Sequence, residues 1–265
     1  MIILMIVTIF SLNPFYIMAV GAFKASISLR LVPPDLSPFK DLIIGNWDYV
    51  AFKSDIWLWL INSILLGVFV AAITVFVCAC AGYSFAKKDF HGRGILFAVI
   101  IGTMIMPRQM LLIPNYLVAQ NLHLTPNNFL GLVLTTVTLP FGIFLCRQFM
   151  ASIPTELMEA AEIDGCGEIH KFASIVLPLS VPVMGALAIF SFLGSWNDYL
   201  WQLIMISDVK KYTITIGIAF FAQATQTNIG RQMMAALIAT IPILIMFLSF
   251  QKVFIKGITM GGVKG

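Results

Sequence analysis

"EAAEIDGCGEIHKFASIVLPLSVP", Glu159 to Pro182, is a polar stretch in a chain that is otherwise strongly apolar. Five acids fall within 13 residues around its start, at positions 156, 159, 162, 164 and 168. Only Lys171 follows nearby, and an apolar run resumes at once. The stretch is therefore predicted to be a short exposed loop between two apolar segments.

The composition places the apolar segments in a membrane. Of the 265 residues, 60% are hydrophobic and 11% are charged, and the mean hydropathy is +0.96. Soluble domains carry about 25% charged residues, so this balance indicates an integral membrane protein. The net charge of +4 is spread along the chain. It fits basic residues beside membrane ends and gives no reason to expect nucleic acid as a partner.

Six apolar runs of about 20 residues are long enough to cross the hydrocarbon core as helices. They cover residues 1–23, 57–86, 94–118, 128–150, 179–206 and 233–255. We therefore predict an all-α integral membrane protein with about six transmembrane helices in a single domain, residues 1–265. The first run has no basic segment before it and no small-residue cleavage site, so we do not expect a secretory signal.

Basic residues favour a cytoplasmic position for both termini. The loop "KKDFHGR" (87–93) abuts two apolar runs, and lysines 252, 256 and 264 lie on the same side in this topology. The loop after the first run also carries basic residues, at positions 24, 30, 40 and 53, so the simple count nearly ties. On this topology residues 153–178 are cytoplasmic.

Local signals within residues 153–178 predict a short helix and a sharp turn. Pro154 suits a first helical turn, and Glu156 favours the positive end of the helix dipole. Gly165 stands where a residue with positive φ ends a helix. A narrow face dominated by small side chains lies between them at helical spacing: Leu157, Ala160, Ala161 and Asp164. A solvated amphipathic loop is the alternative.

The spacing of this loop resembles the EAA signature of ATP-binding-cassette (ABC) importer permeases. Glu159-Ala160-Ala161 is followed after three residues by Gly165, and after nine more by Ile175-x-Leu177-Pro178. The chain most resembles the shorter maltose-type permease of carbohydrate importers, of the type I fold. Stretches 13–24, 62–94, 153–165, 194–208 and 256–265 match in the right order. Gln202 stands where relatives often place proline, which leaves the local bend of the fifth run open.

The resemblance implies that the EAA helix is a coupling helix, docked in a cleft of a separate ATPase. Its residues would be Glu159, Ala160, Ala161, Asp164 and Gly165. The sequence has no G-x-x-x-x-G-K-[ST] phosphate loop, so ATP and Mg²⁺ would be bound by the partner ATPase, with no cofactor in this chain. The other implied partners are a second, longer permease, an ATPase dimer and an extracellular solute-binding protein. The chain would be half of a translocation pathway and not an enzyme.

Polar and aromatic residues in the fifth run are candidates for the substrate pathway. They are Trp196, Asn197, Asp198 and Tyr199. Amides and ionisable groups within a span usually face a cavity or a partner, and flat aromatic faces suit sugar rings. An interfacial aromatic belt, or a packing role for the motif, is the alternative.

Arg108 is a second candidate, because Pro107 and Pro114 are expected to interrupt the third run. It would meet an acidic sugar or the binding protein, or extend to the outer interface. The three histidines, at positions 91, 123 and 170, are expected to be solvated. The four cysteines, at positions 78, 80, 146 and 166, lack the paired spacing of a zinc site and are expected to act as small hydrophobic residues.

The C-terminal residues "KGITMGGVKG" match the tail of maltose-type relatives. The resemblance implies that Met260, Gly261, Gly262, Val263, Lys264 and Gly265 lie between the two ATPases. Three glycines in the last five residues suit a thin strand of backbone in a crevice better than a packed helix. A frayed terminus is the alternative.

Two other classes of protein remain as alternatives. A secondary transporter also has broken helices, but it is usually longer, has internal repeats and lacks the EAA loop. An intramembrane enzyme needs a catalytic pair within the spans, and the sequence offers none. Within the importer class, a phosphodiester, amino acid or peptide is the alternative to a carbohydrate.

Overall fold

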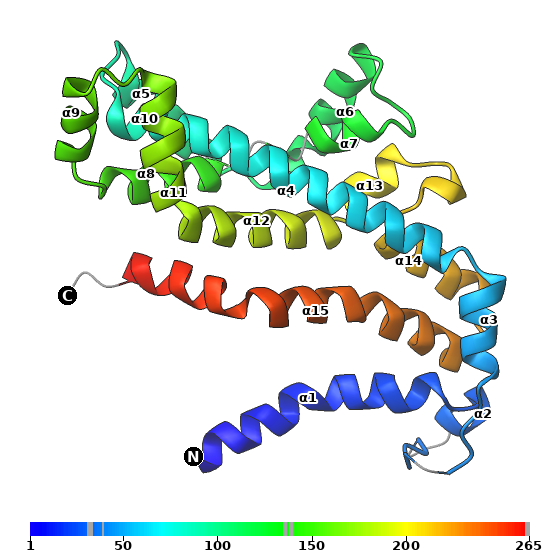
Figure 1. The fold of residues 1–265 in the computed structure, drawn as a ribbon. Helices are drawn as coiled ribbons and strands as arrows, with labels where there is room; N and C mark the ends of the chain where they lie inside the picture. The colour runs from blue at the N-terminus through cyan, green and yellow to red at the C-terminus, as the bar shows by residue number, and fades with distance from the viewer. Residues whose placement is uncertain (31–33, 39, 135–136, 138–139, 263–265) are drawn as a thin grey trace. The chain divides into compact units, whose positions relative to one another are not determined.

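The computed structural model is built from helices and divides into two compact units (Figure 1). It describes residues 1–265 except 31–33, 39, 135–136, 138–139 and 263–265, and for residues 2, 27 and 252–262 it describes the backbone alone. No strand occurs in the described part of the chain, which confirms the all-α prediction.

The first unit combines residues from both ends of the sequence, Met1–Ser63 and Ile206–Leu248. The two units are therefore not successive segments of the chain. The helices of the first unit are α1 (Ile2–Ala22), α2 (Ser26–Leu29), α3 (Gly45–Lys53), the start of α4 (Ile56–Lys87), η3 (Val209–Lys211), α14 (Ile214–Ala224) and most of α15 (Ile229–Gly262).

Side-chain amides and hydroxyls join distant segments within the first unit. The Asn62 amide donates to the carbonyls of Lys210 and Tyr212, at 2.9 Å each. The Ser63 hydroxyl accepts the backbone N–H of Ile214 at 2.7 Å. These bonds satisfy polar groups of η3 and the start of α14, which would be costly to bury unpaired in an apolar environment.

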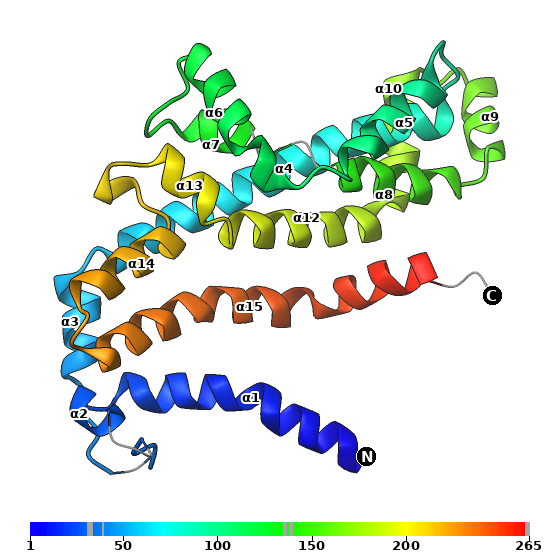
Figure 2. The ribbon, with the colours of Figure 1, turned by 180° about the vertical axis from the view of Figure 1, so that it is seen from behind.

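The second unit is Ile64–Met205 with Ser249–Gly265. Figures 1 and 2 show α9 at one end of it, beside α5 and α10, and α6, α7 and α13 at the other end. Besides the rest of α4, its helices are α5 (Arg93–Thr103), η1 (Arg108–Leu111), α6 (Leu112–Asn121), α7 (Phe129–Leu134), α8 (Pro140–Ala151), α9 (Glu156–Ile163), α10 (Glu168–Lys171), the π-helix η2 (Phe172–Val176), α11 (Leu177–Leu179), α12 (Val181–Trp196) and α13 (Leu200–Met205).

Helices α4 and α8 approach each other closely through small residues. A Cβ added to Gly82 would lie 2.5 Å from the Cβ of Cys146, and one added to Gly142 would lie 2.7 Å from the Sγ of Cys78. Small residues at helix contacts are typical of membrane proteins, where close backbone approach replaces the hydrophobic driving force. Both cysteines are fully buried, as expected of small hydrophobic residues.

Three helices are long and apolar enough to cross a membrane: Ile3–Ala22, Ile56–Lys87 and Ile229–Gln251. The count rises to five if each of two bent pairs, Arg93–Thr103 with Arg108–Asn121 and Glu168–Leu179 with Val181–Trp196, forms one span. The predicted fourth run lies in α7 and α8, and part of the segment between them is outside the described residues. The total of six spans therefore stays a prediction.

The third run is broken where Pro107 stands. Its residues form α5 and then η1 with α6, and the two parts are bent by 99°. Pro107 has the extended φ and ψ of −60° and 128° and ends the preceding turn. The prediction that Pro114 also interrupts this run is wrong. Pro114 is the third residue of α6, in the first turn of the helix, where its missing N–H is tolerated.

Candidate functional site

Helix α9 carries the EAA residues, and one side of it is buried against the rest of the second unit. Its buried residues are Met158 and Ala161. Met158 joins an apolar cluster with Phe85, Ile153 and Val176, among others. Glu159 and Ala160 are exposed. Ala161 is only 7% exposed and packs within the chain, so Ala160 is the more accessible of the two alanines.

Gly165 ends α9 in the left-handed conformation that the sequence predicts. Its φ is +77°, and Asp164 before it is the C-cap. The N–H of Gly165 donates to the Glu162 carbonyl at 3.0 Å, and the N–H of Cys166 donates to the Ala161 carbonyl at 2.8 Å. This pair of bonds is a Schellman motif, which satisfies the last carbonyls of the helix and turns the chain sharply.

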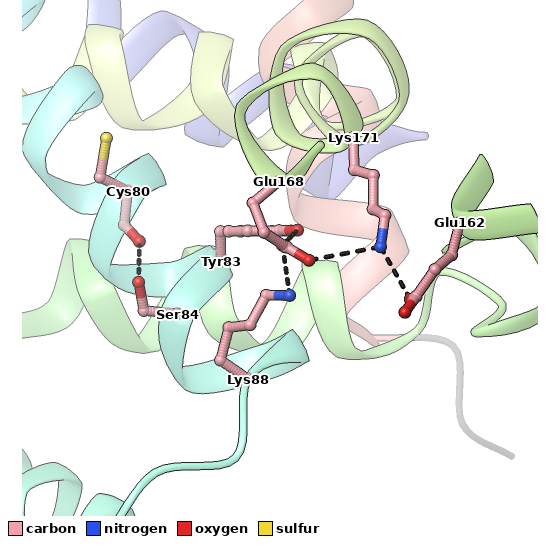
Figure 3. A network of polar contacts seen from close by, with 7 residues as sticks. All are labelled: Cys80, Tyr83, Ser84, Lys88, Glu162, Glu168 and Lys171. Atoms are coloured by element: carbon pink, nitrogen blue, oxygen red, sulfur yellow. Dashed lines mark hydrogen bonds and ion pairs between the residues drawn. The ribbon is translucent and has the colours of Figure 1, made fainter. Parts of the chain in front are cut away.

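A network of charged and polar side chains links α9 and α10 to the end of α4, and we call these residues the charge network (Figure 3). They are Tyr83, Lys88, Glu162, Glu168 and Lys171. The Glu168 carboxylate accepts a hydrogen bond from the Tyr83 hydroxyl at 3.0 Å and also pairs with Lys88. The Lys171 Nζ lies 2.8 Å from Glu162 Oε2 and 3.3 Å from Glu168 Oε1. The charges alternate in sign along the network, so each one has an opposite neighbour.

Hydrogen bonds to these groups shift their pKa values. The Lys88 ammonium, and after it the Tyr83 hydroxyl, lower the pKa of Glu168 to about 2 from an ordinary 4.5. The hydrogen bond from Lys171 lowers the pKa of Glu162 and raises that of Lys171 itself. All three groups are therefore held in their charged forms at neutral pH.

A second region, a cleft of about 1040 Å³, lies within the second unit at the break between α12 and α13. Asn197, Asp198 and Tyr199 line it, as does Arg108 from η1. Arg108 Nη2 lies 3.6 Å from Asp198 Oδ2, and the arginine side chain is 62% exposed while that of the aspartate is 14% exposed. Both residues were candidates on sequence grounds, but nothing in the sequence indicates that they pair.

Trp196 does not line this cleft. It is 4% exposed and stacks on Phe192, with ring centroids 5.6 Å apart. Trp201 lines the cleft instead, and its buried indole N–H has no hydrogen-bond partner among the described residues. The buried amide of Gln202 donates to the Ser195 carbonyl at 2.7 Å, and this bond joins the two sides of the helix break.

The remaining candidates lie as follows. The three histidines, at positions 91, 123 and 170, are exposed, as expected.

Met260, Gly261 and Gly262 continue helix α15, so the prediction of a thin strand is wrong for these three residues. Helix α15 thus continues beyond its apolar part, Ile229–Gln251, as far as Gly262. Val263, Lys264 and Gly265 lie outside the described residues.

The chain matches the family model of the binding-protein-dependent transport system inner membrane component over residues 78–260. That range covers more than half of the chain and includes α9, the charge network and the cleft.

Two curated relatives match almost the full chain. The arabinooligosaccharides transport system permease protein AraQ of Bacillus subtilis is 33% identical over 264 residues, which is 98% of this chain and 93% of the relative. The melibiose/raffinose/stachyose import permease protein MelC of the same organism is 30% identical over 257 residues, covering 95% and 91%.

The fold is that of a solved ABC transporter chain. A crystal structure of a bacterial ABC transporter involved in the import of the acidic polysaccharide alginate contains a chain that matches with a TM-score of 0.82. The match covers 96% of this chain and 94% of that chain at 22% identity.

Proposed function

Because the chain belongs to the family of binding-protein-dependent transport system inner membrane components, we propose that α9 couples it to a separate ATPase. The chain is a membrane permease subunit of such an ABC importer and not itself an enzyme. One observation carries the coupling role: α9 is fixed by Met158 and Ala161 on one side and leaves Glu159 and Ala160 exposed on the other. A partner can therefore contact α9 without disturbing its packing.

The chemistry of the exposed side indicates what the partner offers. Glu159 is an uncompensated carboxylate, since it makes no hydrogen bond or ion pair with the described side chains, and Ile163 at the end of the helix is 88% exposed. A cleft with one basic residue and an apolar wall fits this surface. ATP and Mg²⁺ belong to that partner in our proposal, and the acidic turn at Asp164 and Gly165 presents the helix to it.

The coupling role is tested by Glu159→Lys and Gly165→Pro in the purified importer, reconstituted in liposomes with its partners. The first variant places a positive charge opposite a basic residue, and the second cannot adopt positive φ. Both are expected to insert in the membrane normally and to lose uptake. Glu156→Gln, on the same helix, is the matched control and is expected to transport. Uptake by Glu159→Lys at the wild-type rate would contradict the coupling role.

We further propose that the cleft is part of a carbohydrate pathway. The relatives named for arabinooligosaccharides and for melibiose, raffinose and stachyose support this class of substrate. So does the lining of the cleft, which combines aromatic Tyr199 and Trp201 with the amides of Asn115 and Asn197. Rings stack on sugar faces, and amides bond to hydroxyls in both directions.

Asn197→Ala tests the cleft. Losing one hydrogen bond to substrate is expected to raise the concentration for half-maximal uptake by about two- to tenfold. Gln120→Ala is the control, because this exposed residue of α6 does not line the cleft. If the half-maximal concentration is unchanged in Asn197→Ala, Asn197 does not contact substrate. Its amide would then serve only the bond to the Leu193 carbonyl.

The assembly we propose is one copy of this chain, one longer permease, two ATPase subunits and an extracellular solute-binding protein. Both termini and α9 face the cytoplasm in this arrangement, and residues 260–265 reach the interface of the two ATPases. Native mass spectrometry of the purified importer is expected to give that composition. A stable complex with two copies of this chain and no second permease would contradict it.

A further inference from the structure

The charge network joins segments that are far apart in the sequence. Tyr83 lies near the end of α4, Lys88 directly follows that helix, Glu162 comes from α9, and Glu168 and Lys171 come from α10. Figure 3 shows Glu168 between Lys88 and Lys171, with Glu162 on the far side of Lys171. A continuous path of hydrogen bonds and ion pairs therefore runs from the last turn of α4 to the last turn of α9.

Lys171 is the most constrained member. Its side chain is 5% exposed, although it carries a full charge. A buried ammonium is costly unless opposite charges surround it, and here the two partners are Glu162 and Glu168. Lys171 therefore holds the end of α9 against α10, because separating the two helices would leave its charge without compensation.

Glu168 extends the connection to α4. One carboxylate oxygen faces Tyr83 and Lys88, and the other faces Lys171. The Tyr83 ring also packs on Phe172, with centroids 5.0 Å apart, and Lys88 lies 5.8 Å from the centre of the same ring. The contact between α10 and the end of α4 is therefore held by directional bonds and by ring packing.

Apolar contacts alone do not fix the orientation of α9. It has eight residues, of which only Met158 and Ala161 are buried, and a helix of this length is not stable by itself. Both residues lie on one side of the helix, and apolar contacts of this kind have no preferred direction. The Glu162–Lys171 pair adds a directional attachment one helical turn after Met158.

We propose that Tyr83, Lys88, Glu162, Glu168 and Lys171 are positioning residues for coupling, which hold α9 so that its displacement moves the end of α4 with it. This inference rests on the proposed coupling role of α9. It adds that the force applied to α9 reaches a membrane-spanning helix through the charge network, rather than through the chain that connects α9 to its neighbours.

Lys171→Met is the main test, since methionine fills the buried site without a charge. The full importer is reconstituted in liposomes, and uptake is measured per ATP hydrolysed, together with the amount of ATPase that co-purifies. The expected result is normal co-purification with about two- to thirtyfold less uptake per ATP. Lys53→Met is the matched control, because this exposed lysine ends α3 in the other unit. It is expected to behave as wild type.

Glu162→Gln keeps the test valid if Lys171→Met does not fold, because the Glu162 side chain is 75% exposed. It is expected to lower uptake per ATP in the same direction. Combined with Lys171→Met, it is expected to add no further loss, because both changes open the same link. Hydrogen exchange of residues 156–164 should rise in each variant.

Two results would overturn the inference. One is wild-type uptake per ATP in both single variants. The other is unchanged uptake per ATP in either variant whose α9 exchanges faster, since the charge network would then contribute local stability only. If Glu159→Lys abolishes uptake in the same preparation, only the positioning role fails. If Glu159→Lys also transports normally, the coupling role of α9 fails as well.

Discussion

Gly165 sets the direction in which the chain leaves α9, and it does so by conformation alone. Its φ of +77° is in the left-handed region, and a Cβ at this position would meet no atom within 4 Å. Gly165→Ala is therefore expected to cost about 1–2 kcal/mol through backbone strain, without a steric clash. Hydrogen exchange of residues 156–164 measures this as roughly tenfold faster opening.

Gly167→Ala is the control for that prediction. Its φ is −70°, which alanine adopts without strain, and a Cβ there also meets no atom within 4 Å. Equal exchange in the two variants would show that the turn does not depend on the left-handed conformation of Gly165.

Glu168 makes the region pH-dependent in a defined window. Its folded pKa of about 2 lies below the ordinary 4.5, so its ion pairs contribute stability above pH 4.5 and lose that contribution as the pH falls toward 2. We expect the Glu168 carboxyl to titrate near 2 by carbon-13 NMR of glutamate-labelled protein. In Lys88→Met the titration should move up toward 4.5, because Lys88 is the largest cause of the shift. A wild-type titration already near 4.5 would contradict the ion pair.

The contact between α4 and α8 is the element-scale feature that depends most on residue size. Gly82 has the Cys146 Cβ and the Arg147 backbone within 3.0 Å of any added Cβ. Gly82→Val is expected to force the helices apart and to destabilise the protein by about 1–3 kcal/mol. The thermal midpoint of the detergent-purified importer measures the loss. Gly102→Val, where no atom lies within 4 Å, should leave the midpoint unchanged, and an equal loss at both positions would argue against close packing.

Helices and their ends were predictable to the extent that their signals are local. The long apolar run in α4, the break at Pro107 and the left-handed Gly165 each depend on residues within a few positions of one another. The Arg108–Asp198 pair and the Tyr83–Glu168 bond join residues 90 and 85 positions apart. Nothing in the spacing of one sequence indicates such partners.

Burial of charged residues was also beyond the local pattern. Five acids around one lysine fit a solvated loop, yet Lys171 is buried and its acids are the exposed partners. The burial of Ala161 was equally beyond the local pattern. Helical spacing identifies which residues share a face, but the cluster around Met158 decides which face is covered.

At the scale of the whole molecule, the tail extends the last long helix. α15 runs to Gly262, so removing residues 260–265 shortens a helix as well as the segment after it. We expect this deletion to change ATPase stimulation or the amount of co-purified ATPase while membrane insertion stays normal. If the truncated protein hydrolyses ATP and imports substrate as wild type does, the tail has no part in the ATPase interface.

The most direct test of coupling asks which protein lies against α9 in the assembled importer. A photoreactive benzoylphenylalanine at Ile163, which is 88% exposed, would report the neighbour of the helix. The same group at Ile113 of α6, 73% exposed and at the other end of the second unit, is the control (Figures 1 and 2). Mass spectrometry of the cross-linked product from position 163 should identify a subunit with a G-x-x-x-x-G-K-[ST] phosphate loop, and position 113 should not yield it. An intact, transporting importer in which position 163 never cross-links to that subunit would contradict the coupling role of α9.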